Sequence, residues 1–203
     1  MQARLPHAPE RYRDAALLIV DKPSGLPTQA PQGGGPNLYE ALRSTEARLA
    51  LHHRLDTPAS GLVLFTLDPR ANPAIARGFR EHQIQRIYLA AVLGDPGEVG
   101  QWTTPIEGQA ARTDWRRVRA WAGFSWLECQ LHTGRCHQIR LHAAQAGYPL
   151  LGDRRHGGAA GRLWPRLALH ARALRLNHPM TQDRLEVESP IPEDLLALWE
   201  GRL

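Results

Sequence analysis

The hydrophobic pattern of the chain predicts five strands. Residues 16–20 (Ala-Leu-Leu-Ile-Val) form a continuous apolar run that ends at Asp21-Lys22-Pro23-Ser24-Gly25, which is typical of a buried strand entering a turn. Residues 61–67 form a second such run, and residues 84–93 alternate between two apolar faces with the period of a strand. Strands are therefore expected at residues 16–20, 61–67, 84–93, 124–131 and 167–176.

Other segments have helical spacing or helix-start signals. Asn37 is a candidate N-cap for a helix to about residue 50, with Leu38, Leu42 and Leu49 on its apolar side. Asp68-Pro69 predicts the start of a helix to about residue 83, with Ile75 and Phe79 facing inward.

Two more helices are predicted in the C-terminal half. One begins within residues 132–140 and ends at Gly147; because His137 and Arg140 are both placed on it, three positions apart, we expect them to project from one face. The tail from residue 190 to 203 predicts a short amphipathic helix through Leu195, Leu196 and Trp199.

The order of these elements predicts the fold class. Strands and helices alternate irregularly, which favours an α+β fold over a doubly wound parallel sheet. No change in composition, internal repeat or low-complexity segment divides the chain, so we expect one domain over residues 1–203.

The charge of the chain favours a polyanionic partner. The formal net charge is +5, and Lys22 is the only lysine among 25 basic residues, so the other 24 are arginines. A guanidinium binds phosphate in a bidentate way and stacks on bases, although a bias in coding-sequence composition also explains many arginines. The segment 112–120 leaves two interpretations open: Arg112, Arg116, Arg117 and Arg119 form either a solvated edge-strand face or a phosphate-binding patch with Trp115 as a stacking surface.

Cysteine usage and the N-terminus predict a cytoplasmic location. Two cysteines, Cys129 and Cys136, cannot build a disulfide framework, which favours a reducing compartment. Residues 1–12 are polar, without the apolar core of a signal peptide, and the nearby apolar run is far shorter than the roughly 20 residues that span a bilayer. We expect no membrane association.

The histidines, cysteines and serines do not show the spacing of two common kinds of site. The densest group of metal-ligand types, His132, Cys136, His137 and His142, has neither C-x2-C nor H-E-x-x-H spacing, so no zinc site is predicted. Ser60 lies in Ala-Ser-Gly and not in a nucleophile elbow, so it is interpreted as a turn residue. Asp56 lies on a Pro-containing turn before the buried strand at 61–67, although an exposed ion pair with Arg54 would explain the same pattern.

Four blocks of the sequence, taken in order, resemble the RluA-type RNA pseudouridine synthases. They are residues 18–26 (Leu-Ile-Val-Asp-Lys-Pro-Ser-Gly-Leu), His53-Arg54-Leu55-Asp56, residues 85–90 (Gln-Arg-Ile-Tyr-Leu-Ala), and residues 131–142 with their continuation at 147–153. The resemblance covers most of residues 17–180. It implies a large mixed, mostly antiparallel sheet with a central RNA-binding and catalytic cleft, and isomerisation of selected uridines in tRNA or rRNA to pseudouridine.

The resemblance also implies roles for particular residues. Asp56 matches the family's nucleophile, Tyr88 the tyrosine that packs on the target base and later removes a proton, and Arg140 the basic residue paired with the aspartate. Arg54 matches an arginine that helps to flip the uridine out of the RNA. The remaining motif residues are expected to contact substrate: Leu55, Thr133, Gly134, Arg135, His137, Gln138 and Ile139.

The chemistry of the reaction agrees with this set. Isomerisation breaks the C1′–N1 bond and forms a C1′–C5 bond, so it is redox-neutral and is expected to need neither cofactor nor metal. It does need an ionised carboxylate to attack the sugar or base or to stabilise cationic character at C1′. An RNA partner and a monomeric enzyme are expected.

Some positions differ from the family pattern, and two other functions stay open. Ala59 replaces a usual threonine, Cys136 stands where Thr or Lys is common, and His156 replaces a tyrosine. Because the first block lies so near residue 1, no S4 RNA-binding domain is expected. The alternatives are a non-catalytic RNA-binding or RNA-remodelling protein on the same fold, and a small-molecule hydrolase that uses Asp56.

Overall fold

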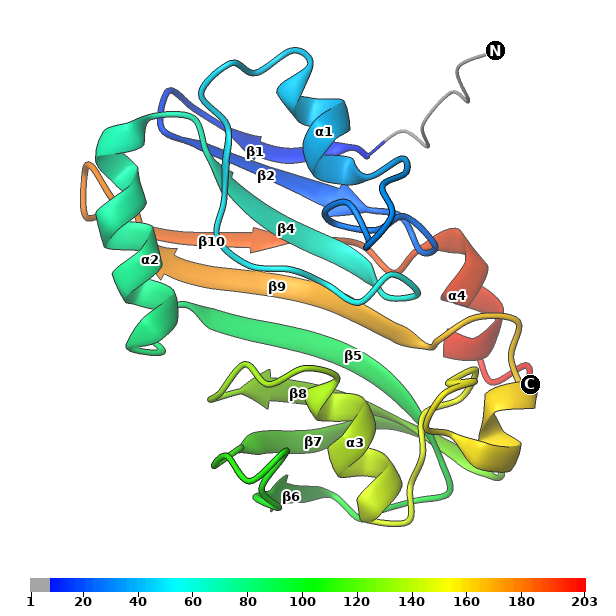
Figure 1. Ribbon diagram of the computed structural model, residues 1–203. Coiled ribbons are helices and arrows are strands. Elements are labelled where there is room, and N and C mark those ends of the chain that lie inside the picture. Colours follow the sequence, from blue (N-terminus) through cyan, green and yellow to red (C-terminus); the bar gives the residue numbers. More distant parts are fainter. Residues whose placement is uncertain (1–7) are drawn as a thin grey trace. The chain divides into compact units, whose positions relative to one another are not determined.

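A computed structural model describes residues 8–203, which fall into two compact units. Unit 1 contains residues 8–84 and Ala173–Ser189, and unit 2 contains Gln85–Arg172 and Pro190–Leu203 (Figure 1). Of the polar N-terminal segment discussed above, residues 1–7 lie outside the described part. That residues 1–203 act as one catalytic domain stays a prediction.

Unit 1 is built on an antiparallel sheet. Its strands β1 (Glu10–Arg13), β2 (Leu17–Lys22) and β4 (Ser60–Thr66) are neighbours in that order. The short β3 (Ala50–Leu51) pairs with β4, and β10 (Arg184–Glu188) forms a hairpin with β9 (Leu169–Asn177). The strands predicted at 16–20 and 61–67 are confirmed because their apolar runs form this buried sheet, whereas the sequence pattern did not predict β1, β3 or β10.

One face of the unit 1 sheet is covered by a helix. The 3-10 turn η1 (Pro69–Ala71) continues into α2 (Asn72–Arg80), and the Asp68 side chain caps it by accepting from the Arg70 N–H, as the Asp68-Pro69 signal predicts. Ile75 packs with apolar residues of β2 and β4, and Phe79 lies against the same cluster. This helix ends at Arg80, three residues earlier than predicted.

The first predicted helix is correct at its start and too long at its end. Asn37 caps α1 (Leu38–Arg43) by accepting from the Glu40 N–H at 3.0 Å. The helix ends after six residues instead of reaching residue 50. Ser44 and Thr45 explain the early end, because their hydroxyls donate to the carbonyls of Ala41 and Leu42 and compete with the helical pattern.

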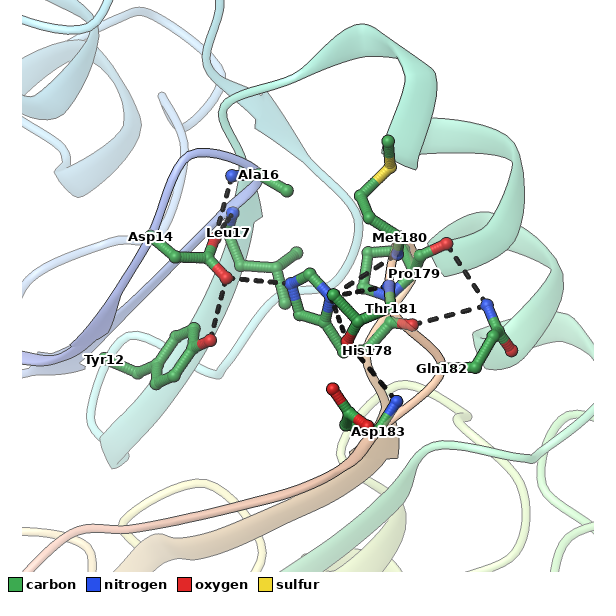
Figure 2. A network of polar contacts seen from close by, with 10 residues as sticks. All are labelled: Tyr12, Asp14, Ala16, Leu17, His178, Pro179, Met180, Thr181, Gln182 and Asp183. Carbon is green, nitrogen blue, oxygen red and sulfur yellow. Dashed lines mark hydrogen bonds and ion pairs between the residues drawn. The ribbon is translucent and has the colours of Figure 1, made fainter.

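A polar network joins the β1–β2 turn to the β9–β10 turn (Figure 2). Oδ1 of Asp14 accepts from the N–H groups of Ala16 and Leu17, and Oδ2 accepts from the Tyr12 hydroxyl and lies 2.8 Å from Nε2 of His178. Nδ1 of His178 accepts from the Thr181 N–H at 3.2 Å, which places the proton of the neutral ring on Nε2, toward Asp14. Burial opposes ionisation of Asp14, but the hydrogen bonds it accepts outweigh burial and hold its pKa below the ordinary value.

We expect Asp14→Ala to lower the free energy of unfolding by about 2 kcal/mol, because several donors lose their acceptor in a partly buried site. Urea unfolding at pH 7 measures the effect. Asp183→Ala is the matched control, since this exposed side chain lies in the β9–β10 turn beside the network and no contact of its carboxylate is part of it; it should change stability by less than about 0.5 kcal/mol. Equal effects of the two variants would contradict the role of Asp14.

Unit 2 also contains antiparallel strands, which belong to the same 10-stranded sheet. Its strands follow the order β5 (Gln85–Leu93), β8 (Phe124–Leu131), β7 (Thr113–Trp121) and β6 (Val99–Trp102). Three helical segments accompany it: α3 (Gln138–Gln145), η2 (Gly158–Arg162) and α4 (Glu193–Trp199). The strands predicted at 84–93, 124–131 and 167–176 are confirmed to within two residues, and β6 was not predicted.

The tail helix packs on unit 2 with a different face from the one predicted. Leu195 and Leu198 are fully buried in a cluster with Trp126, whose indole N–H donates to the Leu198 carbonyl at 3.2 Å. Trp199 lies against the same cluster, but Leu196 is 40% exposed, so its predicted place in the apolar stripe is wrong. Among residues 8–203, no helix is long and apolar enough to cross a bilayer.

Neither sequence-based interpretation of segment 112–120 describes its structure. Residues 113–116 of β7 pair with β6 on one side and β8 on the other, so this half of the segment is not an edge strand. Trp115 is only 8% exposed and packs on Trp102 with ring centroids 5.5 Å apart, which removes it as a stacking surface for bases. A Cβ atom at Gly100 would lie 2.4 Å from the Trp115 ring, so glycine is needed there for the two strands to pack.

Candidate active site

The loop that carries Asp56 joins β3 to β4 in unit 1. Leu55 is buried, and its N–H and C=O both bond to the Thr28 hydroxyl at 3.1 Å. The carbonyl of Asp56 accepts from the Ala59 N–H at 3.0 Å, which closes the Pro58 turn. Asp56 is half-buried and Arg54 is exposed. In residues 8–203 no ion pair joins Arg54 to Asp56, so the surface-pair interpretation is wrong.

Lys22 stabilises the Asp56 loop through hydrogen bonds to backbone carbonyls. Its side chain is fully buried, and Nζ donates to the carbonyls of Pro23, Leu26 and Thr57 at 2.9, 2.7 and 3.2 Å. The next turn adds two bonds, from the Gly25 N–H to Thr57 and from the Ser24 hydroxyl to Pro58. The first and second sequence blocks therefore form one hydrogen-bonded unit around Asp56.

We expect Lys22→Met to lower the free energy of unfolding by about 2–3 kcal/mol, because buried carbonyls lose a charged donor. Chemical denaturation measures the change, and proteolysis should cut the 52–59 loop faster in the variant. Arg77→Met, on the exposed side of α2, is the control and should be nearly neutral. If the Lys22→Met protein were as stable as the parent and its loop equally resistant to proteolysis, the backbone contacts alone would be enough to hold the loop, which would contradict the role of Lys22.

Two histidines attach the same loop to the sheet. Nε2 of His53 accepts from the Leu64 N–H at 2.9 Å, and its ring lies against Phe79 at a centroid distance of 4.7 Å. Nε2 of His52 lies 2.9 Å from the Thr66 hydroxyl. The residues before Asp56 are therefore fixed on β4 and α2.

The other two predicted catalytic residues lie in unit 2. Tyr88 is on β5, 7% exposed, opposite Cys129 of β8. Arg140 is on α3, 4% exposed, and its guanidinium donates to both carboxylate oxygens of Asp153, at 2.9 Å from Nε and 2.7 Å from Nη2. Asp153 was not among the predicted site residues, although it closes the fourth sequence block.

Asp153 is held as a carboxylate in the interior. Its Oδ1 also accepts from the N–H groups of Arg155 and His156, at 3.1 Å each. Burial alone would raise its pKa, but the hydrogen bonds from Arg140 and the backbone, with the charge of Arg140, outweigh burial and lower the pKa below the ordinary value. The pair therefore fixes the Arg140 side chain in one orientation.

The loop before α3 is organised by Gln138. Its Oε1 accepts from the Thr133 hydroxyl at 2.7 Å and the Arg135 N–H at 3.0 Å, and its Nε2 donates to the Arg112 carbonyl and the Thr113 hydroxyl. Both Gln138 and Ile139 are 3% exposed. These two residues support the loop from inside, whereas Gly134 and Arg135 are exposed on its surface.

The prediction that His137 and Arg140 project from one helix face is wrong. His137 precedes the helix in the left-handed conformation, with φ of 54°. The hydrogen bonds of Gln138 turn the loop sharply at this point, so the helix starts one residue after His137. Nδ1 of His137 lies instead 2.9 Å from Nε2 of His156.

The histidines that suggested a metal site have other partners. His142 is buried between the Thr113 hydroxyl and the Thr104 carbonyl, each at 2.9 Å, and Nε2 of His132 lies 2.7 Å from Asp114. In the part of the chain that the structure describes, no three His, Cys, Asp or Glu side chains gather where they could hold a metal ion.

The loops described above lie within, or directly after, a segment that matches the sequence model of a known family. A sequence model described as RNA pseudouridylate synthase matches residues 16–145, which include Asp56, Tyr88 and Arg140. The chain belongs to this family. It is 35% identical to ribosomal large subunit pseudouridine synthase D of Nitrosomonas europaea, over 94% of this chain and 64% of that protein. The synthase D of Pseudomonas aeruginosa is 33% identical, over 92% of this chain and 69% of that protein.

Solved structures of pseudouridylate synthases agree with the fold. Human RNA pseudouridylate synthase domain containing 4 has a TM-score of 0.79 and covers 95% of this chain at 20% identity, which shows the fold alone. Human RNA pseudouridylate synthase domain containing 1 has a TM-score of 0.78 at 25% identity. The predicted α+β class with a mostly antiparallel sheet and the RluA-type resemblance are both confirmed. The chain spans about two thirds of the length of the bacterial relatives, 64% and 69% of the two named above.

Proposed function

We propose that this protein isomerises one or more uridines of ribosomal RNA to pseudouridine, with Asp56 as the nucleophile. The observation that carries the proposal is the Asp56 loop itself, whose backbone on both sides of the carboxylate is fixed by Thr28, Lys22 and Ser24. A carboxylate on a fixed turn is suited to attack at a defined position. Ribosomal RNA is preferred to tRNA because the bacterial relatives above carry large-subunit names.

In this proposal Tyr88 stacks on the target base and removes the proton from C5 after the new bond forms, and Arg140 acts with the aspartate. Arg54 helps to move the uridine out of the RNA stack. Flipping a base costs a few kcal/mol, and stacking on an aromatic ring recovers about 1–3 kcal/mol, so one tyrosine can offset much of the cost. The uridine would lie in the central cleft that the resemblance implies.

The other predicted residues take two roles. Thr133, Gly134, Arg135 and His137 belong to the loop before α3 and are proposed to contact the RNA, together with Leu55 through its backbone. Gln138 and Ile139 are proposed to position that loop, because their side chains are buried. A monomer acting in the cytoplasm as one catalytic domain, without metal or cofactor, completes the proposal.

The test is to incubate the purified protein with an unmodified transcript of bacterial large-subunit ribosomal RNA and map pseudouridine by carbodiimide labelling and primer extension. We expect new pseudouridine at one or a few positions, and none in a shuffled transcript. Binding without product would favour the non-catalytic RNA-binding alternative. Activity on free uridine derivatives without any polynucleotide would favour the hydrolase alternative.

A further inference from the structure

The arginines of unit 2 differ in whether a carboxylate neutralises them. On β7, Arg116 donates from Nε and Nη2 to both oxygens of Glu128, at 2.8 and 2.9 Å. Arg117 is paired with Asp95, and Arg112 donates to both oxygens of Asp114. In the folded protein, neighbouring carboxylates therefore neutralise the positive charge of these three arginines.

Some exposed arginines of unit 2 have no such partner, and three of them lie close to the loop before α3. Arg135, Arg154 and Arg155 are exposed, and within residues 8–203 no carboxylate forms an ion pair with any of them. Arg135 is oriented by a bond from Nε to the Ala110 carbonyl at 3.1 Å, which leaves its terminal nitrogens available. These three side chains therefore present positive charge that no carboxylate offsets, whereas Arg116 and Arg117 of β7 are ion-paired.

The three arginines lie on two loops that contact each other. Residues 133–137 and 153–157 are joined by the His137–His156 contact at 2.9 Å. The second loop is rigid, because Gly157 and Gly161 pack so closely that a Cβ atom would lie 2.5 and 2.6 Å from the Asp153 carbonyl. A closely packed loop fixes the backbone from which Arg154 and Arg155 project, which lowers the entropic cost of binding a polyanion.

The same loops are attached to the proposed catalytic arginine. The N–H of Arg155 donates to Oδ1 of Asp153, the oxygen that also accepts from Arg140. Phosphate bound by Arg154 and Arg155 would therefore be placed at a defined distance from Arg140.

We propose that Arg135, Arg154 and Arg155 form an RNA phosphate-binding surface beside the target nucleotide, and that the ion-paired Arg116 and Arg117 of β7 do not contribute to it. This rests on the proposed function, because it takes RNA as the partner. An unpaired guanidinium gains a full charge-assisted bond to phosphate, whereas Arg116 and Arg117 would first have to leave Glu128 and Asp95.

The test compares two double variants with matched loss of charge. Arg154→Gln/Arg155→Gln removes two of the three arginines of the proposed surface, and Arg116→Gln/Arg117→Gln removes two ion-paired arginines of β7. Binding of each protein to an unmodified large-subunit ribosomal RNA transcript is measured between about 50 and 300 mM KCl. Thermal unfolding of each variant confirms the fold, and Arg154→Lys/Arg155→Lys separates charge from guanidinium geometry.

We expect the first double variant to bind at least about tenfold more weakly near 150 mM salt, with a slope of log K against log salt reduced by about 1.4, since each lost phosphate contact on single-stranded RNA contributes about 0.7. The lysine variant should keep most of the slope, and the β7 variant should bind within about twofold of the parent. Unchanged binding by the first variant, or an equal loss in both, would overturn the inference even if pseudouridine is formed. If the parent protein forms no pseudouridine, the proposed function fails, and the slopes still decide which arginines bind RNA.

Discussion

Asp56→Asn should abolish pseudouridine formation while RNA binding persists. The amide has nearly the shape of the carboxylate but cannot attack the sugar or base or stabilise positive charge at C1′. Removing the nucleophile of an enzyme lowers turnover by several orders of magnitude, so single-turnover rates should fall at least about 10³-fold. RNA affinity should be equal or slightly higher, because one negative charge is lost near a polyanion.

The control for this variant is Asp183→Asn, an exposed carboxylate in the β9–β10 turn of the same unit. It should keep the parent's rate and affinity. Both variants should unfold at the parent's denaturant midpoint, because the Asp56 loop is held through backbone groups and Lys22 rather than through the Asp56 carboxylate alone. A rate for Asp56→Asn within tenfold of the parent would exclude Asp56 as nucleophile.

The buried strands could be predicted because each is formed by a continuous apolar run in the sequence. Apart from Thr66, the positions of residues 16–20 and 61–67 that the sheet buries are apolar or glycine, so the local pattern alone indicates two buried strands. The capping residues Asn37 and Asp68 were equally local signals. The strands that were missed, such as β6 with Gly100 and β10 with its charged residues, form because a neighbouring strand offers backbone partners, which a polar sequence does not reveal.

For the candidate site, the sequence motifs identified candidate residues, but they did not predict which side chains contact one another. Spacing placed His137 on a helix, but hydrogen bonds from Gln138 to Arg112 and Thr113, 26 and 25 residues away, start the helix later. Asp153 and Lys22 matter through partners distant in sequence, so periodicity could not identify them. The signal for Lys22 was its rarity: a single lysine among 24 arginines indicates a position that needs a compact ammonium group with three donors.

Asp153→Asn should destabilise the protein by about 3–5 kcal/mol, because it leaves the Arg140 guanidinium buried beside a neutral group. Arg140 and Asp153 are 5% and 1% exposed at their side chains, so water cannot replace the lost charge. Since Arg140 also loses its orientation, pseudouridine formation should fall in the same variant even at temperatures where it is folded. Urea unfolding and single-turnover assays at 15 °C separate the two effects.

The surface pair Arg116–Glu128 is the matched control, with side chains 63% and 30% exposed. Glu128→Gln should lower the free energy of unfolding by less than about 1 kcal/mol, because water screens an exposed pair.

The pH dependence of stability gives a further check on the ionised state of Asp153. The pKa of Asp153 is lowered from an ordinary value of 3.8, so its contribution to stability is complete above that pH and is lost as pH falls through the folded-state pKa. The stability difference between the parent and Asp153→Asn should therefore be constant from pH 7 to about 5 and shrink below about pH 4, and a difference that grows on acidification would contradict an ionised Asp153.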